Sequence, residues 1–198
     1  TGLFAGGLSL KYDSKIMKVV DVLPTSKLNG SYWRANFDKQ GEVRFAFASA
    51  QSTSGGGNLF NIEFEVLSDT DGQVSPLVFE DVRFSESLNV AKTNGSVTVL
   101  PKNTQLLQNY PNPFNPETWL PYQLAKDANV TISIYDIKGQ LVRMLHLENQ
   151  SAGVYVTKDK AAYWNGKNSE GAKVASGIYF YTLQANEFTA TRRMLIVK

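Results

Sequence analysis

A run of alternating prolines and asparagines near the middle of the chain most restricts how the chain can fold. Between residues 106 and 118, three prolines alternate with asparagines. Each proline fixes its own φ angle and lacks a backbone N–H, so neither a helix nor a central strand can continue through the run. Tyr110 and Phe114 are spaced as anchors on an extended segment. We interpret the run as the hinge and first strand of a second β-sandwich, with both rings buried and residues 101–109 packed between the two sandwiches.

Composition indicates a folded protein and excludes several kinds of site. Of the 198 residues, 42% are hydrophobic and 12% aromatic. This is enough for two domains of about a hundred residues each. With no cysteine and one histidine, the chain cannot form disulfides, zinc–thiolate sites or multi-histidine metal sites. The chain begins without an initiator Met or a signal peptide, and we expect it to be a fragment or mature form of a longer protein.

Charge is spread too evenly for a nucleic-acid-binding surface. Residues 1–100 contain 9 basic and 11 acidic side chains (net −2), and residues 101–198 contain 11 and 7 (net +4). The lysines are scattered in both halves and form no stripe. No apolar run approaches the roughly 20 residues of a membrane helix. We therefore expect no nucleic-acid partner and no membrane-spanning segment.

Alternating apolar and polar residues predict an all-β sandwich in residues 1–100. This alternation has the period of a half-buried strand, and turns containing glycine separate the segments. No segment of convincing length has the period of a helix. Short strands at this spacing are typical of a sandwich. The predicted strands are residues 8–13, 16–22, 30–37, 43–48, 59–66, 76–79, 82–84 and 96–100.

Three sequence blocks in this half carry a resemblance to a known family. They are Gly7–Asp13 followed by Ile16–Val20, then Gly41–Ala48, and then Gly57–Val66. In these blocks the half resembles the cohesin family. The resemblance implies a jelly-roll sandwich that serves as an adhesion or scaffolding module and binds a protein partner or a neighbouring subunit.

The resemblance also implies that the first sandwich is incomplete. A cohesin has one or two further strands before the position of Gly2. We therefore expect open backbone edges beside Leu8–Tyr12 and near Ser96–Val99. Open edges invite another strand. We predict that residues from outside the first hundred fill the edge, either from an upstream segment or, second, from a strand donated by a neighbouring subunit. The remaining alternative is a rearranged domain.

Residues 118–198 contain a second series of predicted strands. The last two form a hairpin across Asn186 and Glu187. Together with the first strand in the proline-rich run, this series makes about seven strands in under a hundred residues, which indicates an immunoglobulin-like sandwich. The predicted strands are residues 119–124, 130–136, 141–145, 161–164, 176–183 and 189–197.

The motifs of this half span nearly its whole length. They are Asn109–Pro116, Val130–Gly139, Trp164–Asn168, Ala175–Tyr181 and Arg192–Lys198. Together they resemble the C-terminal sorting domain of type IX secretion substrates, in the version related to the Ig-like domain of flagellar hook-capping proteins. The resemblance implies recognition by secretion machinery, passage across an outer membrane, and retention at or release from the cell surface.

The same resemblance places a sorting signal in the terminal hairpin, from Gly177 to Lys198. We predict that this hairpin is required for delivery to the surface. Its candidate signal residues are Arg192, Arg193 and Lys198. Arg192 and Arg193 are adjacent in a strand and so point to opposite faces, which leaves at least one available to a receptor.

The predicted architecture is therefore all-β, with two β-sandwiches in tandem. Residues 1–100 form a jelly-roll, cohesin-like sandwich that lacks its opening strand or strands. Residues 101–117 form a proline-rich linker and lead into the second domain. Residues 118–198 form the Ig-like C-terminal sorting domain.

The sequence contains no persuasive catalytic, cofactor-binding or metal site. Glu63 and Glu65 share a strand face, as a glycosidase pair could, but no other catalytic group accompanies them and we favour a solvated face. Residues 69–72 begin like a calcium loop but lack its later ligands. Residues 165–171 offer oxygen atoms, although two glycines and asparagines explain a tight loop. We predict a protein that is not an enzyme, with calcium as the one cofactor left open.

Two adjacent aromatic pairs, Tyr32–Trp33 and Tyr163–Trp164, are candidates for contacts with a ligand. In each pair we expect one ring to face outward. A carbohydrate platform needs several coplanar exposed rings, so we favour packing over sugar binding. Tyr32 and Trp33 remain the candidate contacts to a partner or a polysaccharide.

These observations favour a non-enzymatic extracellular or cell-surface protein of a bacterium. Its partners are expected to be a protein or a neighbouring subunit and, through the second domain, the secretion machinery. The alternative is a carbohydrate-binding module of a secreted multidomain hydrolase, with a polysaccharide as partner. Loss of polysaccharide binding on Trp33→Ala would distinguish the alternative.

Overall fold

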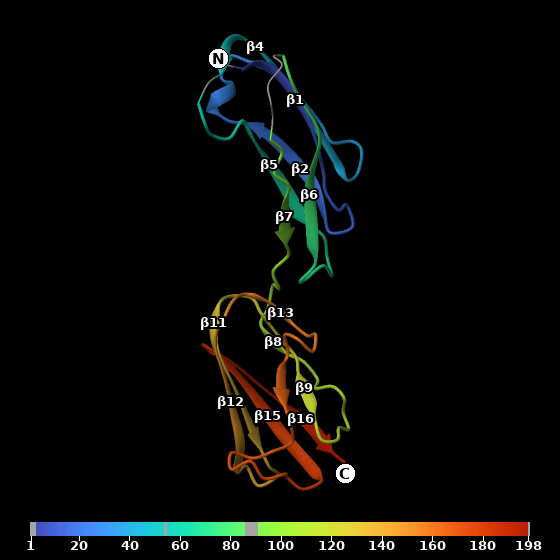
Figure 1. The fold of residues 1–198 in the computed structure, drawn as a ribbon, viewed down its shortest axis with the longest axis vertical. Helices are drawn as coiled ribbons and strands as arrows, with labels where there is room; N and C mark the ends of the chain where they lie inside the picture. The colour runs from blue at the N-terminus through green and yellow to red at the C-terminus, as the bar shows by residue number, and fades with distance from the viewer. Residues whose placement is uncertain (1–2, 54, 86–90, 198) are drawn as a thin grey trace. The chain divides into compact units, whose positions relative to one another are not determined.

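The computed structural model describes residues 3–53, 55–85 and 91–197 and consists almost entirely of β-strands (Figure 1). The chain divides into two compact units, residues 1–99 and residues 100–198. The predicted all-β class, with two units built of strands that follow each other in the chain, is confirmed. The helical element of the described residues is a single 3-10 turn, Ser26–Leu28.

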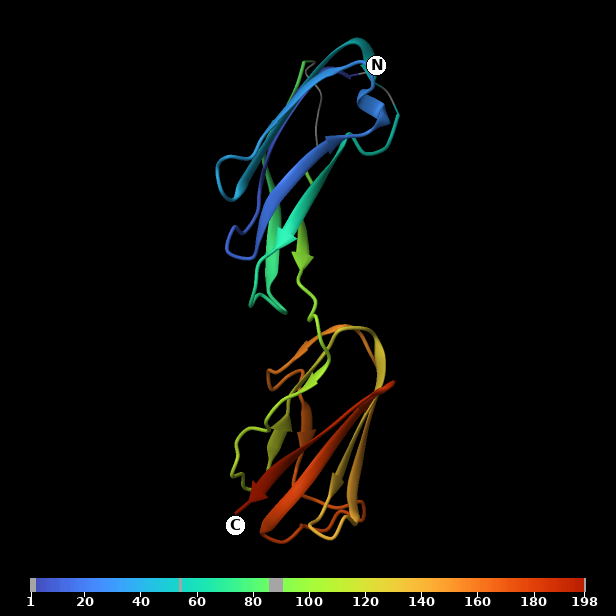
Figure 2. The ribbon, with the colours of Figure 1, turned by 180° about the vertical axis from the view of Figure 1, so that it is seen from behind.

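The first unit contains two facing sheets of unequal size. The larger sheet has five strands in the order β3-β4-β1-β6-β7, and the smaller sheet pairs β2 with β5. Figure 2 shows β2 and β5 on the near side of the unit. The strands are β1 (Leu3–Lys11), β2 (Met17–Pro24), β3 (Tyr32–Asn36), β4 (Glu42–Thr53), β5 (Phe60–Val66), β6 (Val74–Phe84) and β7 (Gly95–Thr98).

Strand β4 shows how the alternating sequence builds the first core. Val43, Phe45 and Phe47 point into the sandwich and are 0%, 2% and 6% exposed. The intervening Arg44 and Ala46 are exposed. Phe45 stacks on Phe60 of β5, with ring centroids 4.3 Å apart, so the two sheets meet across apolar side chains.

The predicted open edge beside Leu8–Tyr12 is wrong. Strand β1 lies in the middle of its sheet and pairs with β4 on one side and β6 on the other. The physical reason is that β6 runs as one long strand, where the sequence predicted two short ones. A bulge opposite Ser9 and Leu10 lets β6 continue through Glu80 and Asp81, where the alternation breaks. Among the described strands, the open edges of the first unit are those of β2, β3, β5 and β7.

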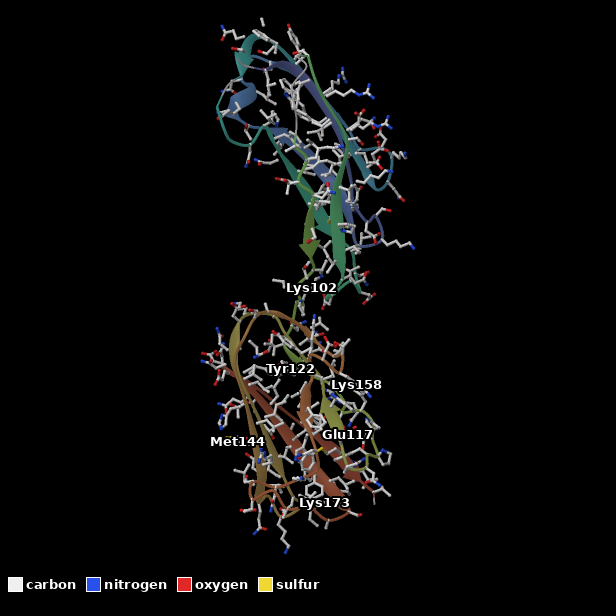
Figure 3. The ribbon with its side chains drawn as sticks, in the orientation of Figure 1. Lys102, Glu117, Tyr122, Met144, Lys158 and Lys173 are labelled. Carbon is white, nitrogen blue, oxygen red and sulfur yellow. The ribbon has the colours of Figure 1, made fainter. Side chains whose placement is uncertain are left out.

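The second unit contains a four-stranded sheet, in the order β12-β11-β15-β16, and two smaller sheets, β13-β10-β8 and β14-β9. Tyr122 lies inside this unit, and Met144 lies on its outside (Figure 3). The predicted final hairpin is present, because Ala185 pairs with Phe188 across the turn. The strands are β8 (Gln105–Leu106), β9 (Thr118–Leu120), β10 (Tyr122–Leu124), β11 (Ala128–Tyr135), β12 (Leu141–Gln150), β13 (Gly153–Tyr155), β14 (Ala162–Trp164), β15 (Gly177–Ala185) and β16 (Phe188–Ile196).

The proline-rich run is built into the second unit. Phe114 is 2% exposed, and its N–H donates to the Leu195 carbonyl at 3.0 Å while its carbonyl accepts from Val197 N–H at 3.1 Å. The run therefore covers the outer edge of the terminal strand β16. Tyr110 is half-buried, and its hydroxyl donates to the Val156 carbonyl at 2.6 Å.

Residues just before the run are fixed to the same unit. Leu106 belongs to its buried core. The buried Tyr181 hydroxyl donates to the Leu107 carbonyl at 2.7 Å and accepts from Asn109 N–H at 2.9 Å. The packing of residues 101–109 between the two sandwiches stays a prediction.

Candidate functional site

The outer face of the five-stranded sheet in the first unit has a floor of small side chains. This face carries the residues that alternate with the buried ones. On the two central strands these are Ala46 and Ala48 of β4, which lie opposite Gly7 and Ala5 of β1. A sheet face so poor in side-chain volume lets a partner approach close to the backbone.

Larger side chains on β3 and β6 line both sides of this floor. On β3, Tyr32 lies beside Ala48 and Arg34 beside Ala46. On β6, Arg83 lies beside Gly7 and Asp81 beside Ser9. We call this floor and its two sides the sheet trough: Ala5, Gly7, Ser9, Tyr32, Arg34, Arg44, Ala46, Ala48, Asp81 and Arg83.

Two hollows lie along the trough. One of about 440 Å³ lies between β4, β1 and β6 and is lined by Gly7, Ser9, Arg44 and Arg83 among others. The other, of about 340 Å³, lies between β3 and β4, where Tyr32 and Ala46 contribute to its lining. The trough therefore combines small apolar patches with charged side chains, as protein-binding surfaces do.

A buried carboxylate fixes the charges at one end of the trough. The Glu42 side chain is 6% exposed and accepts hydrogen bonds from Ser9 Oγ at 3.0 Å and Arg44 Nε at 2.6 Å. Lys39 Nζ lies 2.7 Å from its other oxygen. The hydrogen bond from Lys39, followed by those from Arg44 and Ser9, lowers the pKa of the Glu42 carboxyl to about 2. Glu42 is therefore ionised at neutral pH and holds Arg44 in place.

Tyr32 and Trp33, which are adjacent in the sequence, lie on opposite faces of β3. Tyr32 is 87% exposed on the trough side of β3. Trp33 points to the opposite face, where its ring lies parallel to that of Phe45 with centroids 6.0 Å apart. The expectation of one outward ring per pair also holds for Tyr163, 47% exposed, and Trp164, 1% exposed. Tyr32 and Trp33 do not share a face, so they form no coplanar sugar platform.

A group of aromatic rings lies on the second unit. Tyr110, which makes an isolated bridge to Trp119, and Tyr163 of β14 flank the Trp119 ring, with ring centroids 6.0 and 5.7 Å from that of Trp119. Lys158 Nζ lies 4.2 Å from the centre of the Trp119 ring, and the Tyr163 hydroxyl donates to Glu117. The lysine stacks on the tryptophan as a cation–π pair, which covers a face that a sugar would need.

The candidate sorting residues lie on and after β16. Arg192 Nε donates to the Leu106 carbonyl at 2.7 Å, so this guanidinium holds β8 against β16. Arg193 lies opposite Phe180 on the outer face of the four-stranded sheet and lines a hollow of about 340 Å³. Lys198 lies outside the described residues.

The loops considered for metal binding use their oxygen atoms internally. Asn168 Oδ1 accepts from Ala172 N–H at 2.8 Å, and Asn165 Oδ1 accepts from Lys167 N–H at 3.2 Å. In residues 69–72, the Thr70 carbonyl accepts from Gln73 N–H at 3.0 Å, as in an ordinary turn. Across residues 3–53, 55–85 and 91–197, no three His, Asp or Glu side chains gather as metal ligands would.

The acidic pair on β5 has an ordinary environment. Glu65 pairs with Lys18 at 2.9 Å, and both side chains are about half exposed.

No helix in the described part of the chain is long and apolar enough to cross a membrane.

Sequence reasoning missed the sheet trough. Its signal is present in Arg44–Ala50, where every second residue after Arg44 is an alanine while Phe45 and Phe47 occupy the alternate positions. The phenylalanines on one face of this strand predict its burial. The alanines on the opposite face are the residues that predict the trough.

Fold and site together define a modular all-β protein, in which one sandwich displays a trough of small residues and a second, Ig-like sandwich follows in the same chain. The family model described as Cohesin domain matches residues 1–99, half of the chain, so the chain belongs to the cohesin family. The model described as FlgD Ig-like domain matches residues 117–188. A comparison with curated proteins finds no match.

Solved structures show similar folds. One is the Coh-OlpC-Doc435 type I cohesin–dockerin complex from Clostridium thermocellum, with 23% identity over 50% of this chain and 74% of that chain, and a TM-score of 0.43. Another is the sixth cohesin of Acetivibrio cellulolyticus scaffoldin B in complex with a mutant Cel5 dockerin, with 22% identity over 50% and 78%, and a TM-score of 0.44.

A third similar structure is PorZ of Porphyromonas gingivalis, described as an essential bacterial surface component of the type-IX secretion system. It shows 20% identity over 46% of this chain and 11% of that chain, with a TM-score of 0.33. The relation of the second unit to type IX sorting domains stays a prediction.

Proposed function

We propose that the first unit is a non-enzymatic scaffolding module that binds a protein partner through the sheet trough. The observation that carries this proposal is the floor of Ala46, Ala48 and Gly7 between the charged and aromatic sides on β3 and β6. Membership of the cohesin family supports it, and the solved cohesins described above are in complex with dockerins. A dockerin is therefore the class of partner that we propose.

The dimensions of the trough favour a helix as the bound element. Neighbouring strands lie about 4.8 Å apart, so the sides on β3 and β6 are separated by about 14 Å. An α-helix with its side chains is about 10–12 Å across. A helix lying along the trough would place its small residues on the alanines and its acidic residues near Arg34, Arg44 and Arg83.

Ala46→Arg tests this proposal by filling the middle of the trough. We expect at least a tenfold loss of affinity, about 1.4 kcal/mol, in calorimetric titration with a panel of dockerin modules. Val20→Arg is the matched control, because Val20 is 50% exposed on β2 in the opposite sheet. Unchanged binding by Ala46→Arg, or equal loss in both variants, would show that the trough is not the binding surface.

We also propose that the second unit delivers the chain through a type IX secretion system to the outer surface of a bacterium or to the medium. The sequence motifs of residues 109–198 and the match of residues 117–188 to an Ig-like domain support this role. Arg193 is the candidate contact, since its guanidinium stands on the outer sheet face while that of Arg192 bonds to Leu106.

Arg193→Glu tests delivery without deleting the strand. We expect reduced surface display, measured by antibody labelling of intact cells, whereas Thr189→Glu on the same strand and face should display normally. Equal display of both variants would remove Arg193 from the signal. The alternative of polysaccharide binding has no supporting geometry at Tyr32 and Trp33, and a pulldown on insoluble polysaccharides decides it.

A further inference from the structure

The sheet trough differs from one end to the other. Because antiparallel neighbours lie opposite each other, its residues form three rows that cross the strands. The first row holds an aromatic ring and two alanines, the second has an arginine on each side of a small-residue floor, and the third is polar throughout. The rows are Tyr32, Ala48 and Ala5; Arg34, Ala46, Gly7 and Arg83; and Asn36, Arg44, Ser9 and Asp81. The trough therefore has an uncharged end and a charged end.

Most charges of the trough already have a partner within the chain. Each charged side chain of the second and third rows except Arg34 belongs to an ion pair among the described residues. The pairs are Arg44 with Glu42 at 2.6 Å, Arg83 with Asp81 at 2.9 Å, and Lys39 with the second oxygen of Glu42 at 2.7 Å. Since two carboxylates here face three cations, the charged end is net positive even without Arg34.

Arg34 is the exception. Its side chain is exposed, and no ion pair to it occurs in the described part of the chain. Across the strands it lies beside Ala46, and both residues line the hollow of about 340 Å³. A guanidinium with no carboxylate partner, next to a floor of small side chains, is suited to a bidentate bond with a carboxylate of a bound protein.

The spacing of the rows matches one turn of an α-helix. Successive rows are two strand residues apart, which is about 6.6 Å along the strand. Residues i and i+4 of a helix are about 6 Å apart along its axis and lie on the same face. A helix that lies along β4 with one residue against Tyr32 and Ala48 therefore presents the residue one turn away to Arg34.

We propose, on the basis of the binding function assigned to the trough above, that Arg34 determines which helix the trough accepts. The partner helix carries an aspartate or glutamate that binds the Arg34 guanidinium over Ala46. Four positions away it carries an apolar residue that contacts Tyr32 and Ala48. A lysine or arginine in the acidic position is rejected, because it meets Arg34 and the cations of the charged end. The two contacts together fix the register of the helix along the trough.

The test uses the full 198-residue chain and a dockerin module that binds it in calorimetric titration and loses affinity on Ala46→Arg. Each exposed aspartate and glutamate of the module's helices is replaced singly by lysine. We expect one of these lysine variants to bind the native chain about tenfold more weakly and to regain that affinity on Arg34→Glu. Arg34→Glu should also weaken the unmodified module about tenfold, and the regained binding shows that this variant is folded.

Lys173→Glu is the matched control, because it changes the net charge of the chain equally at an exposed loop position of the second unit. It should neither weaken the unmodified module nor restore the lysine variant. Restoration by Lys173→Glu to the same extent would overturn the role of Arg34, since a charge anywhere on the chain would then suffice.

The register has its own measurement. Alanine in place of the apolar residue four positions from the acidic one should weaken binding to the native chain, and should weaken binding to Tyr32→Ala much less. Equal losses in the two chains would overturn the proposed contact with Tyr32.

The outcomes distinguish the role of Arg34 from the function of the trough. If Ala46→Arg abolishes binding but Arg34→Glu restores no lysine variant, the role of Arg34 is overturned and the trough stands as the binding surface. If no module of the panel binds, or Ala46→Arg has no effect, the proposed function fails and the role of Arg34 fails with it.

Discussion

The two units are of equal length and both are built from strands, yet they bury very different cores. Among the described residues, the buried cluster of the second unit has 17 members and that of the first has 7. In the second unit, residues around Phe114 bond along β16 and so cover that edge of the four-stranded sheet. In the first unit, the described strands that face the five-stranded sheet are β2 and β5. We call residues 100–198 the closed unit and residues 1–99 the open unit. The comparison teaches that the extent of the second layer, more than strand content, decides how much apolar surface the described part of a sandwich buries.

The largest expected effect is that of removing a core ring from the closed unit. Trp164 is 1% exposed, contacts the rings of Phe114 and Tyr179, and donates its indole N–H to Lys167. Trp164→Ala should cost about 3–5 kcal/mol of unfolding free energy. Phe60→Ala in the open unit should cost about 1–2 kcal/mol, because Phe60 is only half-buried.

Urea denaturation measures this difference unit by unit. Trp33 is the one tryptophan of the first unit, and Trp119 remains in the second after the substitution. Equal losses for both variants would mean that the open layer does not weaken packing at Phe60.

Replacing a glycine by alanine should give the next largest difference in stability between the two units. Gly166 has φ +65°, and a Cβ there would lie 2.5 Å from the Pro116 carbonyl oxygen. Gly166→Ala should therefore cost about 2–4 kcal/mol, from backbone strain and a clash with backbone. A Cβ at Gly6 would lie 2.6 Å from the Phe84 ring and 2.9 Å from the Phe47 ring. Both are side chains, which can shift more easily than backbone, and Gly6→Ala should cost about 1–2 kcal/mol.

Thermal unfolding of both variants checks the order. If Gly6→Ala is the more damaging of the two, the inner face of β6 is less adaptable than its partial burial indicates.

Local patterns in the sequence predicted the strands, because alternation is a property of a few neighbouring residues. The hairpin across Asn186 and Glu187 and the burial of Phe114 were predicted in this way and are confirmed. Strand order was not predictable from the same signal. Placing β1 in the middle of its sheet, between β4 and β6, required knowing that β6 returns beside it through a bulge, which depends on residues about seventy positions apart.

The candidate site was predictable only in part. Tyr32 was a predicted contact residue because it is next to Trp33 in the sequence, and it lies on the trough. The neighbouring alanines were not predicted to be part of a site, because small residues form a floor only when neighbouring strands place them side by side. The bonds of Glu42 likewise join Ser9 to a residue 33 positions away. Such networks follow from sheet register, which a single sequence leaves open.

Removal of the Tyr181 hydroxyl should lower the unfolding free energy of the second unit. The Tyr181 hydroxyl bonds both Leu107 and Asn109, and Tyr181 is fully buried. Tyr181→Phe leaves the Asn109 N–H without its partner and should cost about 1–3 kcal/mol. Tyr179→Phe is the control, because that hydroxyl makes a single bond, to Ala175. Urea titration of both variants tests whether the proline run is fixed to the core through Tyr181.

Alkaline pH offers a second measurement of the same group. Burial raises the pKa of Tyr181 to about 12. Because the folded-state pKa exceeds the unfolded value of about 10, this stabilisation is complete below pH 10 and is lost as the pH rises toward 12. Tyr181→Phe should flatten that part of the stability curve in the second unit, and an unchanged curve would assign the alkaline loss to other groups.

The smallest effect is expected in the open unit at acid pH. The carboxyl pKa of Glu42 is lowered to about 2, chiefly by the hydrogen bond from Lys39 and then by those from Arg44 and Ser9. In the unfolded chain a glutamate has a pKa of about 4.3. The folded state therefore binds fewer protons between these values, and the stabilisation is present above pH 4.3 and lost as the pH falls toward 2.

Trp33 fluorescence in urea, recorded from pH 6 to pH 2, should show this loss in the native chain and a flatter curve in Glu42→Gln. Glu65→Gln, which breaks a half-exposed pair with Lys18, should leave the slope unchanged. If Glu65→Gln flattens the curve as much as Glu42→Gln does, then Glu42 is not the group that links protonation to the folding of the sheet trough.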